Sequence, residues 1–224
     1  APPPPPTPWA KVWASPAVWA IIVGNVVANW SFYNLLTCMP QYMKNVLGLD
    51  ISKLGILASL PYLTAFVVAI GTGQLADAAR GRGGIPTAVV RKLCMGVALA
   101  ATAGALLAVA YLPNLTTTSA VVLLCVAMSG NGIGNSGWMV NHLDIAPPYA
   151  GVLMGITNTF GTVPGFLAPL VTDSITTANP HTEPELLAEQ WRTVFQITAA
   201  VSAFGILFFS AFARGERQAW AVEP

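Results

Sequence analysis

The stretch NHLDIAPPYAG, residues 141–151, holds the side chains of this sequence best suited to acid–base or metal chemistry. It places His142 two residues before Asp144, and a Pro-Pro pair follows. In a soluble enzyme, an imidazole beside a carboxylate would be considered as a general base with its orienting partner, or as a metal ligand. The choice between these roles depends on the elements that carry the two side chains.

The composition indicates what those elements are. Hydrophobic residues make up 54% of the 224 residues and charged residues only 8%, whereas a globular domain carries about 25% charged residues. So little charge means that most of the surface does not face water, and we predict an all-α membrane protein. The net charge of +1, without a basic run, gives no indication of nucleic-acid binding. The cysteines lack metal-ligand spacing, so we expect neither a metal nor a cofactor.

Six apolar runs are long enough to be transmembrane helices, which need about 20 apolar residues. They contain no Lys, Arg, Asp, Glu or His, and they cover roughly residues 17–39, 54–76, 93–112, 118–141, 149–172 and 193–213. We therefore expect a bundle of six transmembrane helices over residues 17–213. A proline-rich linker over residues 1–16 would precede it, and a tail over residues 214–224 would follow.

The Lys and Arg residues predict the orientation of the bundle. Six crossings put both ends on one side, and that side holds seven of the ten Lys and Arg residues. Because cytoplasmic loops carry the excess of Lys and Arg, we expect both ends to be cytoplasmic. The opening APPPPPTP and the lack of an initial Met are typical of the middle of a longer protein.

Polar residues within the apolar runs are candidates for a substrate site. Asn25, Asn29 and Tyr33 recur at intervals of four, on one face of the first helix. Amides in a bilayer are costly unless they face protein or water. The stripe therefore either lines a cavity or forms hydrogen bonds between helices.

The fourth and fifth runs are rich in glycine. SGNGIGNSGWMVNH, residues 129–142, indicates close helix packing or a bendable gating helix. In the fifth run, Gly151 and Gly155 form a G-x-x-x-G pair typical of packing. Thr157 and Asn158 then precede a break rich in Gly and Pro, a pattern that predicts a discontinuous helix at a transport site. Helix packing alone is the alternative.

The charges between the second and third runs are candidates for a gate. In GQLADAARGRG, Asp77 follows Gly73 by four residues, at the end of a helix where an anion is unfavourable. We expect it to pair with a cation, for which the sequence offers Arg80, Arg82 and Arg91. Such a pair could hold one conformation and release in another. The alternative is that these are solvated loop charges.

Several motifs resemble known transporter sequences. GQLADAARGRG resembles the cytoplasmic-loop signature of the major facilitator superfamily, although Arg80 stands where the signature prefers Gly. NWSFYNLLTCMPQYM, SKLGILASLPYL, NHLDIAPPYAG, GITNTFGTVPGFLAP and ARGERQAWA resemble the anion/cation symporter family. That family includes sialin, the vesicular glutamate transporters and the sodium–phosphate cotransporters. The resemblance covers residues 8–220.

The resemblance implies that this chain is the carboxy-terminal half of a twelve-helix protein, built from inverted three-helix repeats. The expected partners are the missing amino-terminal half, a small anion, co-transported H+ or Na+, and the lipid bilayer of the plasma membrane or of a lysosome or vesicle. Candidate anions are an acidic sugar such as sialic acid, phosphate and organic anions. Ala28 stands where the vesicular glutamate transporters have Arg, and Asn25 where sialin has His.

Of the candidate residues, the resemblance supports Tyr33 and Asn158. With those found from spacing and charge, transport would use a cavity formed by Asn25, Asn29, Tyr33, Thr157 and Asn158. A cytoplasmic gate would use Gly73, Asp77, Arg80, Arg82, Arg91 and Asp144. The alternative function is a truncated fragment that transports nothing without its missing half.

In this context NHLDIAPPYAG is no longer expected to be catalytic. It would be the short cytoplasmic turn between the fourth and fifth helices, since Pro147 and Pro148 cannot continue the fourth. His142 and Asp144 would then lie at the membrane surface, away from the cavity. Asp144 would cap the next helix or favour the positive end of its dipole. We do not expect an enzyme, because the apolar runs offer no His, Asp or Glu to assist this pair.

Overall fold

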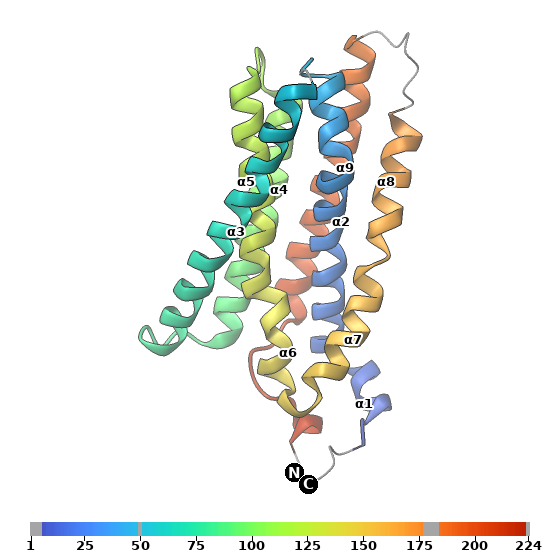
Figure 1. Ribbon diagram of the computed structural model, residues 1–224. Helices are drawn as coiled ribbons and strands as arrows, with labels where there is room; N and C mark the ends of the chain where they lie inside the picture. Colours follow the sequence, from blue (N-terminus) through green and yellow to red (C-terminus); the bar gives the residue numbers. More distant parts are fainter. Residues whose placement is uncertain (1–5, 49–50, 177–183, 223–224) are drawn as a thin grey trace.

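The computed structural model describes residues 6–48, 51–176 and 184–222. Within these stretches the regular structure is helical (Figure 1). The α-helices are α1 (Trp9–Ala14), α2 (Pro16–Asn45), α3 (Ile51–Gly81), α4 (Thr87–Tyr111), α5 (Thr117–Gly134), α6 (Val140–Ile145), α7 (Ala150–Gly161), α8 (Pro164–Ile175) and α9 (Pro184–Phe212). A π-helical turn, η1 (Asn135–Met139), joins α5 to α6, and 3-10 turns form η2 (Pro147–Tyr149) and η3 (Ala219–Ala221).

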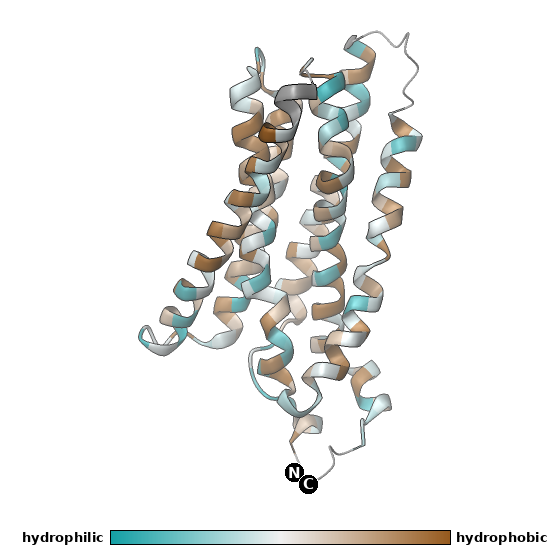
Figure 2. Ribbon diagram, viewed as in Figure 1, coloured by the Kyte–Doolittle hydropathy of each residue, from teal (hydrophilic) through white to brown (hydrophobic). Residues whose placement is uncertain are grey.

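Five helical stretches of the described chain are long and apolar enough to cross a membrane. They are Pro16–Asn45, Gly55–Gly81, Thr87–Tyr111, Thr117–Ile145 and Glu185–Phe212. Even a 25-residue helix is about 37 Å long, which exceeds a hydrocarbon core of about 30 Å. Figure 2 shows a run of hydrophobic residues along the middle of α3, which has little cover from the rest of the chain. The protein is therefore a multi-pass membrane protein.

The fifth predicted run is divided into two helices. α7 and α8 have 12 residues each, too few to cross a membrane singly, and both pack along α2. Pro164 is the first residue of α8 and has no N–H to continue the hydrogen bonds of α7. The discontinuity predicted from the Gly/Pro-rich sequence is thus confirmed.

Helices extend beyond the apolar runs that predicted them. α4 begins at Thr87 rather than at residue 93, and it therefore includes Arg91. The fourth run continues through η1 and α6 to Ile145 and so includes His142. An apolar run ends at the first charge, but a charged side chain does not end a helix.

Glycines bring α5 close to its neighbours. A Cβ atom added at Gly130 would lie 2.5 Å from the carbonyl oxygen of Ala98 on α4, and one at Gly132 would meet the carbonyl of Ala65 on α3. The predicted close packing of this helix is confirmed. Gly151 and Gly155 of α7 have no atom within 4 Å of such a Cβ. The expectation that this pair packs is therefore wrong for contacts within the described chain.

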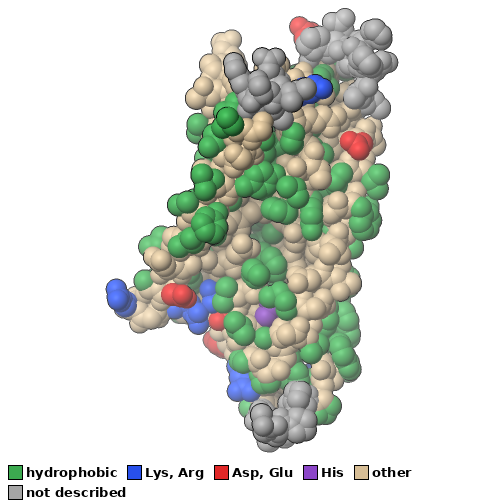
Figure 3. Space-filling view, in the orientation of Figure 1, with side chains coloured by type: hydrophobic (Ala, Val, Ile, Leu, Met, Phe, Trp, Pro, Cys, Tyr) green, Lys and Arg blue, Asp and Glu red, His purple; other side chains and the backbone are tan. Residues whose placement is uncertain are grey.

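Both ends of the described chain lie at the same end of the bundle (Figure 1). The segment expected to be a linker contains α1, whose Val12 is buried, while residues 1–5 of that segment lie outside the described residues. The tail is fixed to α6, because the backbone N–H of Gln218 donates to the carbonyl oxygen of Ile145 at 2.8 Å. Figure 3 shows most of the visible Lys and Arg side chains at this end.

Candidate functional site

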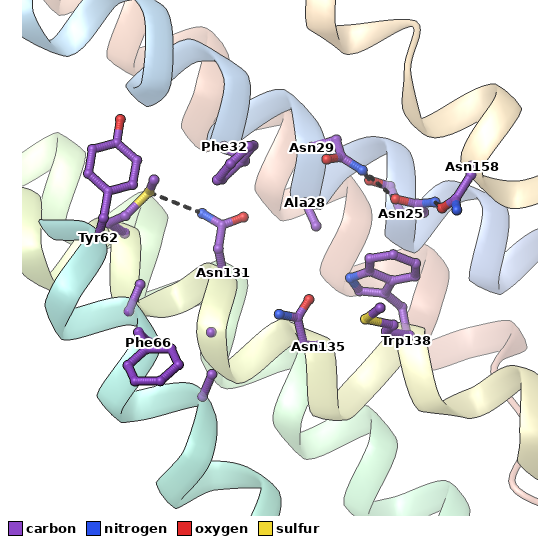
Figure 4. Close-up of a pocket in the computed structure, with 15 residues that line it drawn as sticks. Asn25, Ala28, Asn29, Phe32, Tyr62, Phe66, Asn131, Asn135, Trp138 and Asn158 are labelled. Carbon is purple, nitrogen blue, oxygen red and sulfur yellow. Dashed lines mark hydrogen bonds between the residues drawn. The ribbon is translucent and has the colours of Figure 1, made fainter. Parts of the chain in front are cut away.

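A cavity of about 480 Å³ lies between α2, α3, the α5–η1 stretch and α7 (Figure 4). It is lined by Asn25, Ala28, Asn29, Phe32, Tyr62, Ala65, Phe66, Ala69, Met128, Asn131, Gly132, Asn135, Trp138, Met139 and Asn158. Pockets for small molecules usually measure about 300–1,000 Å³. The cavity is therefore large enough for a small metabolite.

The lining combines amides with aromatic rings. Five of its side chains are asparagines, and Phe32, Tyr62, Phe66 and Trp138 supply rings. None of the lining residues carries a charge. Each amide offers both donors and acceptors, so the lining suits a polar ligand with several oxygens but cannot by itself neutralise an anion.

Three of the five residues predicted for the cavity line it, and two do not. Asn25 and Asn29 on α2 meet Asn158 on α7 there. The ring of Tyr33 packs instead against α8, where a Cβ at Gly165 would lie 3.3 Å from it. Thr157 is fully buried behind the cavity. A spacing of four residues turns a helix by 40° per step, which moves Tyr33 away from the face that Asn25 occupies.

Asn25 joins α2 to α7 at the cavity wall. Its Nδ2 donates to the carbonyl oxygen of Thr157 at 2.9 Å and to Oδ1 of Asn158 at 3.4 Å. Its Oδ1 accepts a hydrogen bond from Asn29. Gly161 leaves the room for this amide, since a Cβ there would lie 2.7 Å from it. The residues predicted from two different runs thus form one hydrogen-bonded group.

Sequence reasoning did not assign Asn131, Asn135 and Trp138 to the cavity. They lie at intervals of four and three along α5 and η1, on one helix face. The same spacing argument that identified Asn25 and Asn29 could have found them, but the surrounding glycines indicated packing. π-helical turns occur frequently at functional sites, and η1 begins at Asn135.

An ion-pair cluster closes the bundle at the end that carries both termini. Arg91 of α4 is 1% exposed, and its Nε and Nη2 donate to the two carboxylate oxygens of Asp144 at 2.7 and 3.3 Å. Arg91 Nη1 also donates to the carbonyl of Ser136 at 2.9 Å. Arg80 of α3 lies 3.4 Å from the same carboxylate. One carboxylate thus joins α3, α4 and α6.

The cluster also reaches the carboxy-terminal tail. Asn141 Nδ2 donates to Asp144 at 3.2 Å and to the carbonyl oxygen of Arg214 at 2.8 Å. A single amide therefore joins the carboxylate to the segment that follows α9. Movement of any one of these elements would break bonds to the others.

The expectation that Asp77 pairs with Arg80, Arg82 or Arg91 is wrong for the arrangement described. Asp77 is exposed and makes no ion pair among the described residues, while Arg80 and Arg91 both bind Asp144. Arg82 is exposed too, and a Cβ at Gly73 would meet nothing within 4 Å. The carboxylate that pairs is the one buried among helices, because a buried charge needs a partner and an exposed one has water.

The expected surface position of His142 and the expected capping role of Asp144 are also wrong. His142 is 1% exposed and lies within α6, with Nδ1 2.8 Å from the carbonyl oxygen of Met139 and Nε2 2.9 Å from the hydroxyl oxygen of Thr157. Asp144 does not cap the following helices, for which no side-chain cap is present. The chain does stop before Pro147, but only after one further helical turn has drawn both side chains inward.

The comparison with protein families agrees with this architecture. The profile of the Major Facilitator Superfamily matches residues 1–169. The chain is 40% identical over 215 residues to human sialin, covering 96% of this chain and 42% of sialin. It is 41% identical over 217 residues to vesicular glutamate transporter 2.1 of Danio rerio, covering 96% of this chain and 35% of that protein. The chain thus spans less than half the length of these relatives.

Two solved structures share the fold. The partially occluded, inward-open xylose transporter XylE of E. coli matches with a TM-score of 0.68 at 14% identity, over 89% of this chain and 50% of that one. A bacterial homologue of the human lysosomal transporter Spinster, inward-facing and unoccupied, matches with a TM-score of 0.64 at 16% identity, over 93% and 52%. The relatives in the Major Facilitator Superfamily, sialin among them, are transporters and not enzymes. The chain belongs to the Major Facilitator Superfamily, with the sialins and vesicular glutamate transporters among its relatives, as its motifs predicted.

Proposed function

We propose that this chain is the carboxy-terminal half of a secondary active transporter that carries a small anion, coupled to H+ or Na+. The observation that carries the proposal is the cavity of about 480 Å³, lined by five amides, within a major facilitator fold. Amide side chains between transmembrane helices have a high energetic cost unless they meet water, a ligand or other polar groups. Alternating access would open this cavity to each side of the membrane in turn.

The proposed half has six crossings, with α7 and α8 together forming the fifth. This arrangement puts the two ends of the chain on one side, and they do lie at one end of the bundle (Figure 1). The excess of Lys and Arg at that end supports a cytoplasmic location for both ends of the chain (Figure 3). The membrane would be the plasma membrane or that of a lysosome or vesicle. The two halves of the bundle would be inverted three-helix repeats.

The amino-terminal half is the partner that this chain needs. An anion site inside a membrane requires a cation or a strong dipole, and none of the residues that line this cavity is charged. We infer that the other half supplies the positive charge. Its contact surface would include the face of α7 with Gly151 and Gly155, which the described chain leaves uncovered.

The lining favours an anion that also carries hydroxyl or carbonyl groups. Five amides can bind such oxygens, and Trp138 offers an apolar face. The family resemblance implies that this chain has Asn25 where sialin has His and Ala28 where the vesicular glutamate transporters have Arg. The lack of Arg at residue 28 disfavours glutamate. An acidic sugar, phosphate or another organic anion are the candidates.

The ion-pair cluster around Asp144 would act as the cytoplasmic gate. In the arrangement described, Arg80 and Arg91 hold α3 and α4 against α6. Opening that end would require at least one of these bonds to break, and closing would restore it. Asp77, Arg82 and Gly73 would contribute to the gate through the amino-terminal half or in another conformation.

The second candidate is a fragment that transports nothing alone. The observation in its favour is coverage, since the chain spans 42% of human sialin. The coding sequence upstream decides between the two. An open reading frame for six further helices, with an intramembrane cation, supports the transporter.

The direct test is transport by the full-length protein in proteoliposomes. Uptake of labelled sialic acid, glutamate and phosphate would be measured under imposed proton and sodium gradients, one at a time. We expect gradient-dependent accumulation of one of these anions, with sialic acid or phosphate above glutamate. Equal uptake with and without each gradient, for all three, would sink the proposal.

A further inference from the structure

His142 occupies a site that suits both of its protonation states. Its Nδ1 lies 2.8 Å from the carbonyl oxygen of Met139. A carbonyl only accepts hydrogen bonds, so Nδ1 must carry a hydrogen in either state. In the neutral imidazole, Nε2 therefore holds a lone pair, and this lone pair faces the Thr157 hydroxyl at 2.9 Å.

The Thr157 hydroxyl has a second partner. Its oxygen lies 3.2 Å from the carbonyl oxygen of Met154, to which the hydroxyl can donate. When His142 is neutral, the hydroxyl donates to Nε2. When His142 is protonated, Nε2–H donates to the hydroxyl oxygen, and the hydroxyl hydrogen turns to Met154. Every polar group concerned thus keeps a hydrogen bond in both states.

We propose that His142 is a proton-binding site of the transporter, which takes up one H+ on Nε2 from the aqueous phase and releases it there again. This inference rests on the proposed transport function and selects H+ over Na+ as the ion that this half can bind. Only one bond forms on uptake, the Nε2–H bond, and the Thr157 hydroxyl exchanges one acceptor for another.

The charges around His142 leave a bound proton uncompensated. The elements packed against α6 are α2, η1, α7, η2 and the tail after α9, which carries the exposed Arg214, Glu216 and Arg217; α3 and α4 reach α6 through Arg80 and Arg91. The described residues of η1 and α7 include no titratable side chain, and the titratable side chain of η2 is Tyr149. On α2 the first titratable side chain is Tyr33, two turns past Asn25. On α6 itself Asp144 is already bound by two arginines.

The site communicates with the cavity through two contacts. The Thr157 carbonyl accepts a hydrogen bond from Asn25 at 2.9 Å, and Asn25 lines the cavity. Trp138 also lines the cavity, and its ring lies 6.2 Å from the imidazole, edge to face. A proton on His142 would place a positive charge one residue behind a chamber that has none, so anion and proton would favour each other's binding.

The first test does not depend on transport. The full-length protein, labelled with ¹⁵N-histidine, would be titrated in detergent, and the His142 signal identified as the one missing from His142→Gln. We expect it to change as the pH is lowered, with a neutral form protonated on Nδ1. A signal that does not change over the pH range in which the protein stays folded, or a neutral form protonated on Nε2, would overturn the proposal.

Two variants of Thr157 sharpen this test. Thr157→Val removes the hydroxyl, which accepts a hydrogen bond from the protonated ring and donates one to the neutral ring. Because a hydrogen bond to a charged group is the stronger of the two, the substitution destabilises the protonated form more. We expect the midpoint of the His142 titration to fall by about one pH unit. Thr157→Ser keeps the hydroxyl and should keep the midpoint. Equal midpoints in the wild type and Thr157→Val would contradict the proposal even if His142→Gln did not fold.

The second test measures counterflow in proteoliposomes at equal pH on both sides. The labelled anion is the one, among sialic acid, glutamate and phosphate, that the uptake assay shows to be transported. The rate at pH 5.5 should exceed the rate at pH 7.5 in the wild type, and the two rates should be nearly equal in His142→Gln. An unchanged ratio of the two rates in His142→Gln would count against the proton site. Absence of counterflow in the wild type would refute the proposed transport function, while the titration would still decide the proton site.

Discussion

Arg91 and Asp144 form a buried, two-pronged ion pair between α4 and α6, with contacts of 2.7 and 3.3 Å and side chains only 1% and 6% exposed. The planar guanidinium matches the carboxylate in geometry. Removing one member of such a pair leaves the other charged and without water. The pair is therefore the contact on which the integrity of this end of the bundle depends most.

Asp144→Asn should strongly destabilise the protein, by about 3–5 kcal/mol if Arg91 stays buried without a counter-charge. The melting temperature of the purified full-length protein in detergent would be the measurement. Asp173→Asn removes an identical charge from an exposed residue of α8 that makes no ion pair among the described residues, and its melting temperature should equal that of the wild type. Equal losses in the two variants would refute the assignment of Asp144 as the paired carboxylate.

The two arginines should differ in their contributions. Arg91→Gln removes three hydrogen bonds of a side chain that is 1% exposed, whereas Arg80→Gln removes a 3.4 Å contact of one that is 33% exposed. We expect a loss of about 3 kcal/mol or more for Arg91→Gln and about 1 kcal/mol or less for Arg80→Gln. Added salt should reduce the second effect more than the first, because buried pairs are screened less. The reverse order would mean that another conformation dominates in solution.

Substitution of cavity amides should weaken substrate binding. Asn158→Ala and Asn131→Ala each remove an amide that lines the cavity, and each should raise KM by about tenfold, the equivalent of one lost hydrogen bond to substrate. Asn45→Ala, at the exposed end of α2, is the matched control. Initial uptake rates at varied anion concentration would be measured. Unchanged KM in both cavity variants would place the substrate elsewhere.

Tyr33 gives a separate prediction, because its ring packs against Gly165 instead of lining the cavity. Tyr33→Phe keeps that ring and should transport nearly as the wild type does. Gly165→Val would push branched carbons toward the ring and should lower the rate by disturbing α8. Strong loss in Tyr33→Phe would show that its hydroxyl contacts substrate in another conformation, as the family resemblance implies.

Two glycines should respond oppositely to alanine. Gly132→Ala would drive a Cβ into the Ala65 carbonyl on α3, so it should cost about 1–3 kcal/mol. Gly155→Ala meets no atom within 4 Å in this chain. Melting in detergent of the half expressed alone and of the full-length protein would separate the two. Gly155→Ala should affect only the full-length protein, where the amino-terminal half would cover this face.

Local sequence properties determined the class of the protein and most of its helices. Apolar length predicts a transmembrane helix because the bilayer is about 30 Å thick, and the Gly/Pro break predicted the division between α7 and α8 because proline lacks an N–H. The motifs were sufficient for the family. The helix periodicity identified Asn25 and Asn29, and the Gly/Pro-rich break pointed to Asn158; all three line the cavity.

Only the tertiary structure decided which charges and polar groups meet. Asp144 pairs with Arg91, which is 53 residues away in the sequence, and Asp77, much nearer to Arg80, pairs with neither. His142 is buried because its helix continues past the apolar run, and it meets Thr157 only because the chain turns back at Pro147. Side-chain types and spacing fix what a helix can present on each face. The choice of partner depends on how helices pack, since a buried charge or amide takes the nearest complementary group in space.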